Sequence, residues 1–178
     1  MSFNIDYDGL AQAMSHHDLL GETLSFFDAE TGEVVFVDDW VKDQARASAD
    51  PDQIDDPAIR LAWYLLWSDG EIGEELPEAE EAILLERAEA CLARYLRVPS
   101  ADSREGYQDM EDFTVTVSNP RLHELLETVL AGKRPFRRFK DALIRYPEER
   151  ERWFEFSNQR LRERIDDWLR EEGILPAE

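Results

Sequence analysis

The sequence predicts a mostly α-helical α+β protein, in which an N-terminal β-hairpin packs with a C-terminal bundle of about four helices. Two β-rich runs, ETLSFFD and EVVFVD, flank the segment AETG, where Gly32 suits a tight turn. Helix-start signals recur in the last third of the chain, at Pro120, Pro135 and Pro147. The apolar content of 43% is that of a folded chain, and 178 residues suit one compact domain.

We expect this single domain to extend over residues 1–178 and to contain two acidic linker or insertion segments. These are residues 41–56 and 68–77, which lack apolar periodicity. Between them, PAIRLAWYLLW (57–67) is apolar on nearly every face, which predicts a buried helix or an interface. A further helix is expected over about 78–96.

Residues 102–172 are expected to form a helical unit of four helices, with breaks near 118, 132 and 146. Asp102 and Asn119 are suited to cap two of these helices, and Gly132 is suited to end one of them. Aromatic residues follow the helical spacing of the apolar stripes and are expected to be mostly buried: Phe136, Phe139, Trp153, Phe154 and Trp168.

The charge is strongly negative and unevenly distributed. The formal net charge is −21, and residues 1–99 carry 23 acidic and 6 basic residues, a net charge of −17. Residues 121–164 hold 12 basic and 8 acidic residues, a net charge of +4. A field this acidic repels nucleic acid and anionic membranes at long range, and it favours a basic protein partner.

Three features predict a cytoplasmic protein. No run of 18 apolar residues is present, so no membrane-spanning segment is expected. The N-terminus MSFNIDYDGL lacks the basic-then-apolar pattern of a signal peptide. The single cysteine, Cys91, cannot form an internal disulfide, and its place on an apolar stripe predicts a buried, inert thiol.

The run GKRPFRRFKDAL concentrates positive charge in this acidic chain. One interpretation is the solvated face of an amphipathic helix, whose cations pair with acidic groups nearby. The other is a site for an anion or an acidic partner, because cations here surround the start of a helix. The candidate residues are Lys133, Arg134, Arg137, Arg138 and Lys140.

Two segments, VPSADSREGYQDMEDF (98–113) and GKRPFRRFKDALIRYPEERERWFEFSNQRLRERIDDWL (132–169), resemble a bacterial family catalogued only as uncharacterised, one of the UPF groups. Its members carry similar SRE-x-Y-x-x-MEDF and FRRFKDAL…RWF-x-F segments. FFDAETGEVV (26–35) resembles the family more loosely, and residues 40–95 lie outside the resemblance. The resemblance implies a small cytoplasmic α+β protein and brings no established activity or catalytic residue.

The chain lacks the common catalytic and cofactor motifs: it has no phosphate loop, no Rossmann glycine pattern and no metal-type cysteine pair. Glu105, Asp109 and Asp112 fall on one helical face and could hold a hard cation or act in acid–base chemistry. A solvated face paired with the basic helix is the favoured interpretation. We therefore predict no cofactor, no metal and no catalytic residues.

Three classes of function follow. The first is a non-enzymatic interaction protein that binds a macromolecular partner through acidic or basic helical surfaces, or through an apolar interface at Trp63, Tyr64 and Trp67. The second is an anion-binding or phosphorylated-ligand protein or enzyme that uses the basic patch 133–140. The third, nucleic-acid binding through the same patch, is disfavoured by the net charge. The sequence does not predict an oligomeric state.

Overall fold

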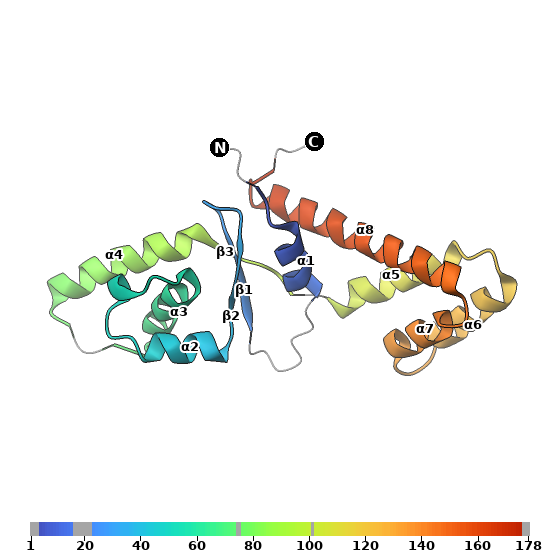
Figure 1. Ribbon diagram of the computed structural model, residues 1–178, viewed down its shortest axis with the longest axis horizontal. Coiled ribbons are helices and arrows are strands. Elements are labelled where there is room, and N and C mark those ends of the chain that lie inside the picture. The colour runs from blue at the N-terminus through green and yellow to red at the C-terminus, as the bar shows by residue number, and fades with distance from the viewer. Residues whose placement is uncertain (1–3, 16–22, 74–75, 101, 176–178) are drawn as a thin grey trace. The chain divides into compact units, whose positions relative to one another are not determined.

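A computed structural model describes residues 4–15, 23–73, 76–100 and 102–175 (Figure 1). The predicted class is confirmed, because the chain is mostly helical and contains one antiparallel sheet near the N-terminus. The chain divides into two compact units, Met1–Ser100 (unit 1) and Ala101–Glu178 (unit 2). No helix within the described ranges combines the length and the apolar character needed to cross a membrane.

The sheet of unit 1 contains the predicted hairpin and one added strand. Its strands are β1 (Leu24–Asp28), β2 (Val34–Val37) and β3 (Tyr95–Arg97), in the order β2-β1-β3. Both pairings are antiparallel, with Phe26 opposite Val35 in β2 and Arg97 in β3. Gly32 has φ 80° in the turn of the hairpin, a conformation that glycine adopts readily.

Helices cover the sheet within unit 1. The helical segments of this unit are α1 (Tyr7–Ser15), α2 (Asp39–Arg46), the 3-10 turn η1 (Pro51–Gln53), α3 (Pro57–Ser68) and α4 (Glu78–Arg94). In Figure 1, α1 lies on one side of the sheet and α2 and α3 on the other. Gly9 lets α1 approach β2, since a Cβ there would lie 2.9 Å from the Cβ of Val34.

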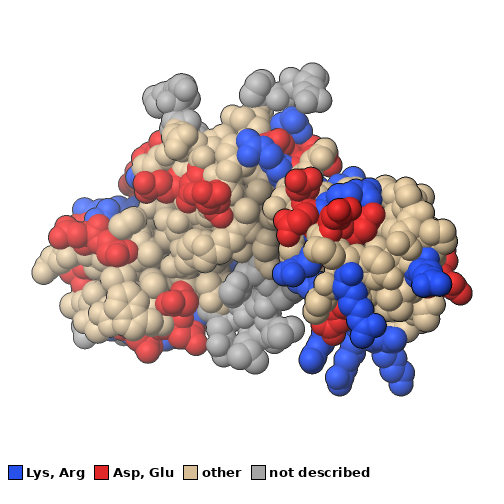
Figure 2. All heavy atoms as spheres, turned by 45° about the vertical axis from the view of Figure 1, so that its right-hand side comes forward, with Lys and Arg blue, Asp and Glu red and all other residues tan. Residues whose placement is uncertain are grey.

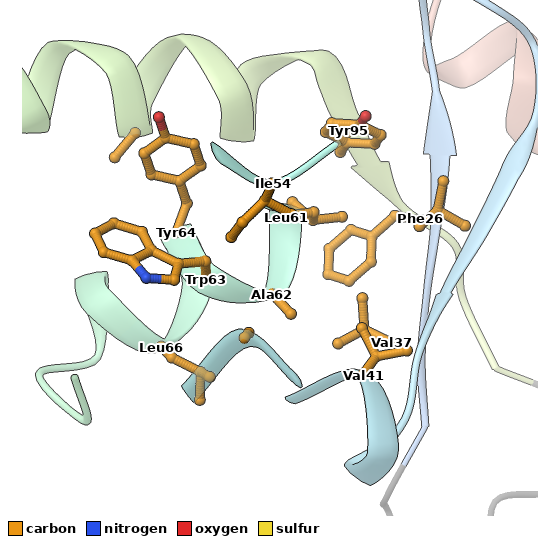
Figure 3. Packing of buried hydrophobic residues seen from close by; sticks show 13 residues of the cluster. Phe26, Val37, Val41, Ile54, Leu61, Ala62, Trp63, Tyr64, Leu66 and Tyr95 are labelled. Atoms are coloured by element: carbon orange, nitrogen blue, oxygen red, sulfur yellow. The ribbon is translucent and has the colours of Figure 1, made fainter. Parts of the chain in front are cut away.

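Helix α3 provides the centre of the core of unit 1. Figure 3 shows Phe26 of β1 reaching toward α3, with Tyr64 directed toward α4 and Leu66 toward α2. Leu61 and Ala62 are fully buried. This helix is apolar on nearly every face because the sheet, α2 and α4 each take one side of it.

Residues 41–56, expected to be an acidic linker or insertion, lie mostly in α2 and η1. The Asp38 carboxylate accepts a hydrogen bond of 2.9 Å from the backbone N–H of Val41 and so caps α2. Val41 and Ala45, four residues apart, are the buried residues of this helix. Two buried positions form too short a stripe to stand out as periodicity. Residues 69–73, 76 and 77 are irregular, and 74–75 lie outside the described residues.

A buried ion pair joins the end of β1 to the end of α4. Asp28 is 3% exposed, and its carboxylate accepts hydrogen bonds from Arg94 Nε at 2.7 Å and Nη2 at 2.5 Å. It also accepts one from the backbone N–H of Glu30. Burial alone would raise the pKa of Asp28, but these hydrogen bonds outweigh it and lower the pKa below its ordinary value.

Unit 2 has the four helices predicted for residues 102–172, with their breaks at the predicted places. They are α5 (Ser103–Val115), α6 (Pro120–Leu130), α7 (Pro135–Leu143) and α8 (Pro147–Glu171). Asp102 caps α5 by accepting from the N–H of Arg104, and Asn119 caps α6 by accepting from the N–H groups of Arg121 and Leu122.

An aromatic cluster forms the core of unit 2. The ring centroids of Phe139 and Trp153 lie 4.9 Å apart, and Phe113 lies 5.3 Å from Trp153. The predicted burial is correct for Phe139, Trp153 and Trp168.

The burial prediction is wrong for Phe136 and Phe154, which are 37% and 39% exposed. Phe154 follows Trp153 directly and lies roughly 100° further around α8, away from the core that Trp153 faces. Its ring lies instead beneath the guanidinium of Arg150, at 5.4 Å. Phe136 is in the first turn of α7, where its ring lies at the edge of the bundle against Gly106 of α5.

Candidate functional site

Unit 1 contains an open groove of about 650 Å³ between the segment after α2, the C-terminal part of α3 and the N-terminal half of α4. We call it the tryptophan groove. Its large apolar side chains come from α3, from the loop that follows and from α4, and are Trp63, Trp67, Ile72, Leu76, Ile83 and Leu84. Predominantly apolar clefts of this size are typical of ligand and partner sites.

The two indole rings in the groove are positioned by specific contacts. Trp63 is 5% exposed, and its Nε1–H donates to the backbone carbonyl of Ser48 at 3.0 Å. Trp67 is half-buried and lies directly against Gly73, where a Cβ would be 2.9 Å from its Cδ1. Gly73 has φ 118°, a backbone conformation that L side chains rarely adopt. Glycine at this position therefore permits both the turn and the close packing of Trp67.

The apolar lining continues onto the exposed rim. Ile83 on α4 is 55% exposed and Leu76, just before α4, is 36% exposed. Leu85 on the same helix is 49% exposed, but it does not line the groove. Large aliphatic side chains beside an apolar groove form a contiguous surface that a partner can cover.

The basic groups on the rim are already paired with carboxylates. Arg46 contacts Asp43 at 3.0 Å and Glu71 at 2.8 Å, and the hydrogen bond with Glu71 raises the pKa of Arg46. Arg87 contacts Asp52 at 2.8 Å. These guanidinium groups therefore contribute little net positive charge to the groove.

Two acidic residues complete the lining. Asp50 accepts a hydrogen bond from the N–H of Asp52, which lowers the pKa of Asp50 and keeps it ionised. Glu80 is exposed in the first turn of α4, beside Glu78 and Glu81. Within the described part of the chain, no ion pair involves these three glutamates. The electrostatic character of the rim is therefore negative.

The predicted apolar interface of Trp63, Tyr64 and Trp67 is thus divided. The two tryptophans line the groove, whereas Tyr64 is 5% exposed in the core, packed edge-on against Trp63 at 5.5 Å, and burial raises its pKa. Sequence reasoning missed Leu76 and Ile83, which lie in or beside an acidic stretch that looks like a solvated connector.

The five predicted cations of the second candidate site, which we call the basic cluster, are all exposed, and they lie together on α7 and the turn before it. Figure 2 shows a group of basic side chains projecting from the lower side of unit 2. Arg134, directly before α7, has φ 56° in the left-handed region. Its predicted role as a binding residue remains a prediction, and so do those of Lys133, Arg137, Arg138 and Lys140.

The cations of the basic cluster have few partners. Among the residues that the structure describes, this cluster makes one ion pair, between Arg137 and Asp141 at 3.9 Å. Both of these side chains are more than half exposed. Such a pair contributes little. The guanidinium of Arg138 lies over the turn at Gly132. A Cβ added to Gly132 would be 2.7 Å from Nη1 of Arg138.

The three carboxylates considered as a cation site, Glu105, Asp109 and Asp112, are paired with arginines of α8. Asp109 contacts Arg160 at 3.1 Å and Arg164 at 2.6 Å, and these two arginines also contact Asp112 and Glu105, respectively. The favoured interpretation, a solvated face paired with the basic helix, is therefore only partly correct. The carboxylates are in ion pairs, but Asp109 is buried and the partners lie on α8 rather than on the basic helix α7.

Cys91 is partly buried and packs against the core of unit 1. Burial raises the pKa of its thiol, which keeps the thiol protonated at neutral pH and therefore unreactive.

The fold and the groove together define a mostly helical α+β protein with an apolar surface groove. The chain belongs to the uncharacterised protein family UPF0158, whose model matches residues 44–178. It is 34% identical to UPF0158 protein PA5073 of Pseudomonas aeruginosa over 106 residues, which cover 60% of this chain and 67% of that protein. No solved structure matches it.

The matched range corrects the extent of the resemblance. It includes most of residues 40–95, which the resemblance did not place, and it begins after the hairpin segment 26–35. Every residue that lines the tryptophan groove and every cation of the basic cluster lies inside it.

Proposed function

We propose that the chain is a non-enzymatic, cytoplasmic interaction protein that binds a protein partner through the tryptophan groove. The observation that carries this proposal is the continuity between the indole-lined groove and the exposed side chains of Leu76 and Ile83. Burial of apolar surface is the main driving force of protein association, and Trp is enriched among the residues that dominate interface energies.

The polar groups of the groove favour a protein segment over a small polar ligand. Specific small-molecule sites present a few convergent polar groups that fix the orientation of the ligand. Here the indole N–H of Trp63 is already bonded to Ser48, and Arg46 and Arg87 are already paired. Across the described residues, no buried side-chain nitrogen or oxygen lacks a hydrogen-bond partner.

Paired substitutions on α4 test the proposal. Ile83→Asp places a charge in the apolar lining, whereas Leu85→Asp places the same charge on an equally exposed side chain of the same helix outside the groove. Proteins that bind the wild type in cell lysate are identified by mass spectrometry, and their binding is compared between the variants. We expect Ile83→Asp to lose the partner and Leu85→Asp to keep it. Equal retention by both variants would contradict binding in the groove.

The basic cluster supports a second candidate function, the binding of an anion or of an acidic protein segment. The specific observation is that, among the described residues, only one of the five exposed cations is in an ion pair, and that pair is long. Arginine guanidinium groups bind carboxylate and phosphate in bidentate geometry. Nucleic acid fits less well, because a strand longer than α7 would extend over a chain whose net charge is −21.

A further inference from the structure

We infer that the segment bound in the tryptophan groove is a basic amphipathic helix. This inference rests on the proposed function and specifies the chemistry of the partner. It combines three properties of the groove: helical walls, an apolar lining of limited length and an excess of negative charge on the rim.

The walls of the groove favour a helix over an extended peptide. An extended segment binds best along the exposed edge of a sheet, where its backbone completes the hydrogen-bonded ladder. The groove is bounded instead by α3 and α4, whose backbone groups are bonded within their own helices, together with residues 48–51, 72–73 and 76, and none of its described lining residues belongs to a sheet edge. A partner helix satisfies its own backbone and presents only side chains to the groove.

The length of the lining fits two turns of such a helix. Along α4 the groove extends from Glu80 to Arg87, a separation of seven positions or roughly 10 Å at the helical rise per residue. Apolar anchors at positions i, i+3 or i+4, and i+7 of a partner helix span the same roughly 10 Å. Two or three aliphatic or aromatic side chains of the partner would therefore contact Trp63, Trp67, Ile83 and Leu84.

The charge around the groove selects a basic partner. Arg46 and Arg87 are neutralised by their carboxylate partners, which leaves the exposed glutamates Glu78, Glu80 and Glu81 at the start of α4. Residues 1–99 carry 23 acidic and 6 basic residues, so the surrounding field has the same sign. Complementary charge speeds the encounter and excludes acidic competitors.

Three fluorescent peptides of about 18 residues, designed to be helical, test the inference on the full-length protein. The first has leucines at i, i+3, i+4 and i+7 with lysine and arginine elsewhere. The second keeps the leucines and replaces the basic residues with glutamate, and the third keeps the basic residues and replaces the leucines with glutamine. Binding is measured by fluorescence anisotropy at low and high salt.

We expect the first peptide to bind at least roughly tenfold more tightly than either of the others, and to weaken as salt rises, because its charges are only partly buried. Ile83→Asp should abolish this binding and Leu85→Asp should preserve it. If the acidic peptide binds as tightly through Ile83, the groove binds a helix but the basic specificity is wrong. If the third peptide, with glutamine in place of leucine, binds as tightly as the first, the contact is only electrostatic and the inference fails. If no peptide responds to Ile83→Asp, the inference fails, whereas the proposed function fails only if the lysate partners also bind Ile83→Asp as they bind the wild type.

A second set of variants separates the rim from the total charge. Glu78→Gln, Glu80→Gln and Glu81→Gln together remove three negative charges beside the groove. The matched control removes the same number from exposed positions of α8 in unit 2, with Glu148→Gln, Glu151→Gln and Glu155→Gln. We expect the rim variant to bind the basic peptide roughly threefold or more weakly and the control to bind nearly as the wild type does. Equal effects would overturn the role of the rim.

Discussion

The guanidinium of Arg164 donates from Nη2 to Oδ2 of Asp109 across 2.6 Å and joins α8 to α5. Arg160 donates from Nε to the other oxygen of the same carboxylate at 3.1 Å. Asp109 is 4% exposed, so its charge is stabilised almost entirely by these two arginines. The pairing explains how three acidic residues on one face of α5 fit into a packed helical unit.

Asp109→Ala should destabilise unit 2 by about 2–4 kcal/mol, because it leaves two guanidinium groups without their shared buried partner. Glu163→Gln is the control, since Glu163 contacts Arg160 at 3.7 Å and is half exposed. This control should cost less than about 0.5 kcal/mol. Urea unfolding followed by circular dichroism measures both. A similar loss of unfolding free energy in the two variants would show that the buried ion pairs of Asp109 stabilise unit 2 no more than an exposed pair does.

Asp28 should make stability depend on pH in the acidic range. Its folded-state pKa is lower than the unfolded value, so it stabilises the fold above the unfolded pKa of about 3.9, and this contribution is lost as pH falls through the folded pKa. The difference in stability between wild type and Asp28→Asn should therefore be largest near pH 6 and shrink toward pH 3. Asp55→Asn, at an exposed position, is the control and should show no such dependence on pH. A stability difference for Asp28→Asn that is constant with pH would contradict a lowered pKa of Asp28.

Two phenylalanines of α7 should differ sharply in their contribution to stability. Phe139 is fully buried against Trp153, so Phe139→Ala should cost about 3–5 kcal/mol. Phe136 is 37% exposed at the edge of the bundle, so Phe136→Ala should cost no more than about 1–2 kcal/mol. Chemical denaturation of the two variants measures the difference, and equal losses would place Phe136 in the core after all.

Gly73→Ala should perturb the tryptophan groove. The new methyl group would lie 2.9 Å from the Trp67 ring, at a φ of 118° that alanine rarely adopts. We expect a loss of about 1–3 kcal/mol and a change in tryptophan fluorescence. Gly70→Ala is the control, because Gly70 also has positive φ, 74°, but nothing lies within 4 Å of its added Cβ. This control should cost about 1 kcal/mol and leave the fluorescence unchanged, and a matching fluorescence change would contradict contact with Trp67.

Local signals in the sequence predicted unit 2 well. Asn119 caps α6 as expected, and Pro135 and Pro147 begin α7 and α8. Phe139 and Leu143, four residues apart, both face the core. Capping residues, prolines and apolar spacing act within a few residues of their effect, so one sequence is enough to read them.

The tryptophan groove could not be predicted in the same way. Its lining combines Trp63 of α3 with Ile83 of α4 and with the segment after α2, which are adjacent only after folding. Helix α2 was missed because its buried face consists of Val41 and Ala45 alone. Phe154 was assigned to the core because its stripe is apolar, whereas Trp153 takes the buried position. These errors concern contacts between segments, which local spacing does not determine.

Replacing Arg134, Arg137 and Arg138 with glutamine together should change stability by less than about 1 kcal/mol. All three are exposed, and the ion pair of Arg137 with Asp141 is long and solvated. The contact of Arg138 with Gly132 is made by Nη1 of an exposed side chain, so its loss should cost little. If the basic cluster binds an anion or an acidic segment, the triple variant should fold normally and lose binding to a glutamate-rich peptide in fluorescence anisotropy.

The control replaces Arg104, Arg121 and Arg162, which are exposed elsewhere in unit 2. It removes the same charge and should leave that binding intact. Unfolding of the first variant would show that its arginines are structural, and retained binding would identify the cluster as a solvated helix face.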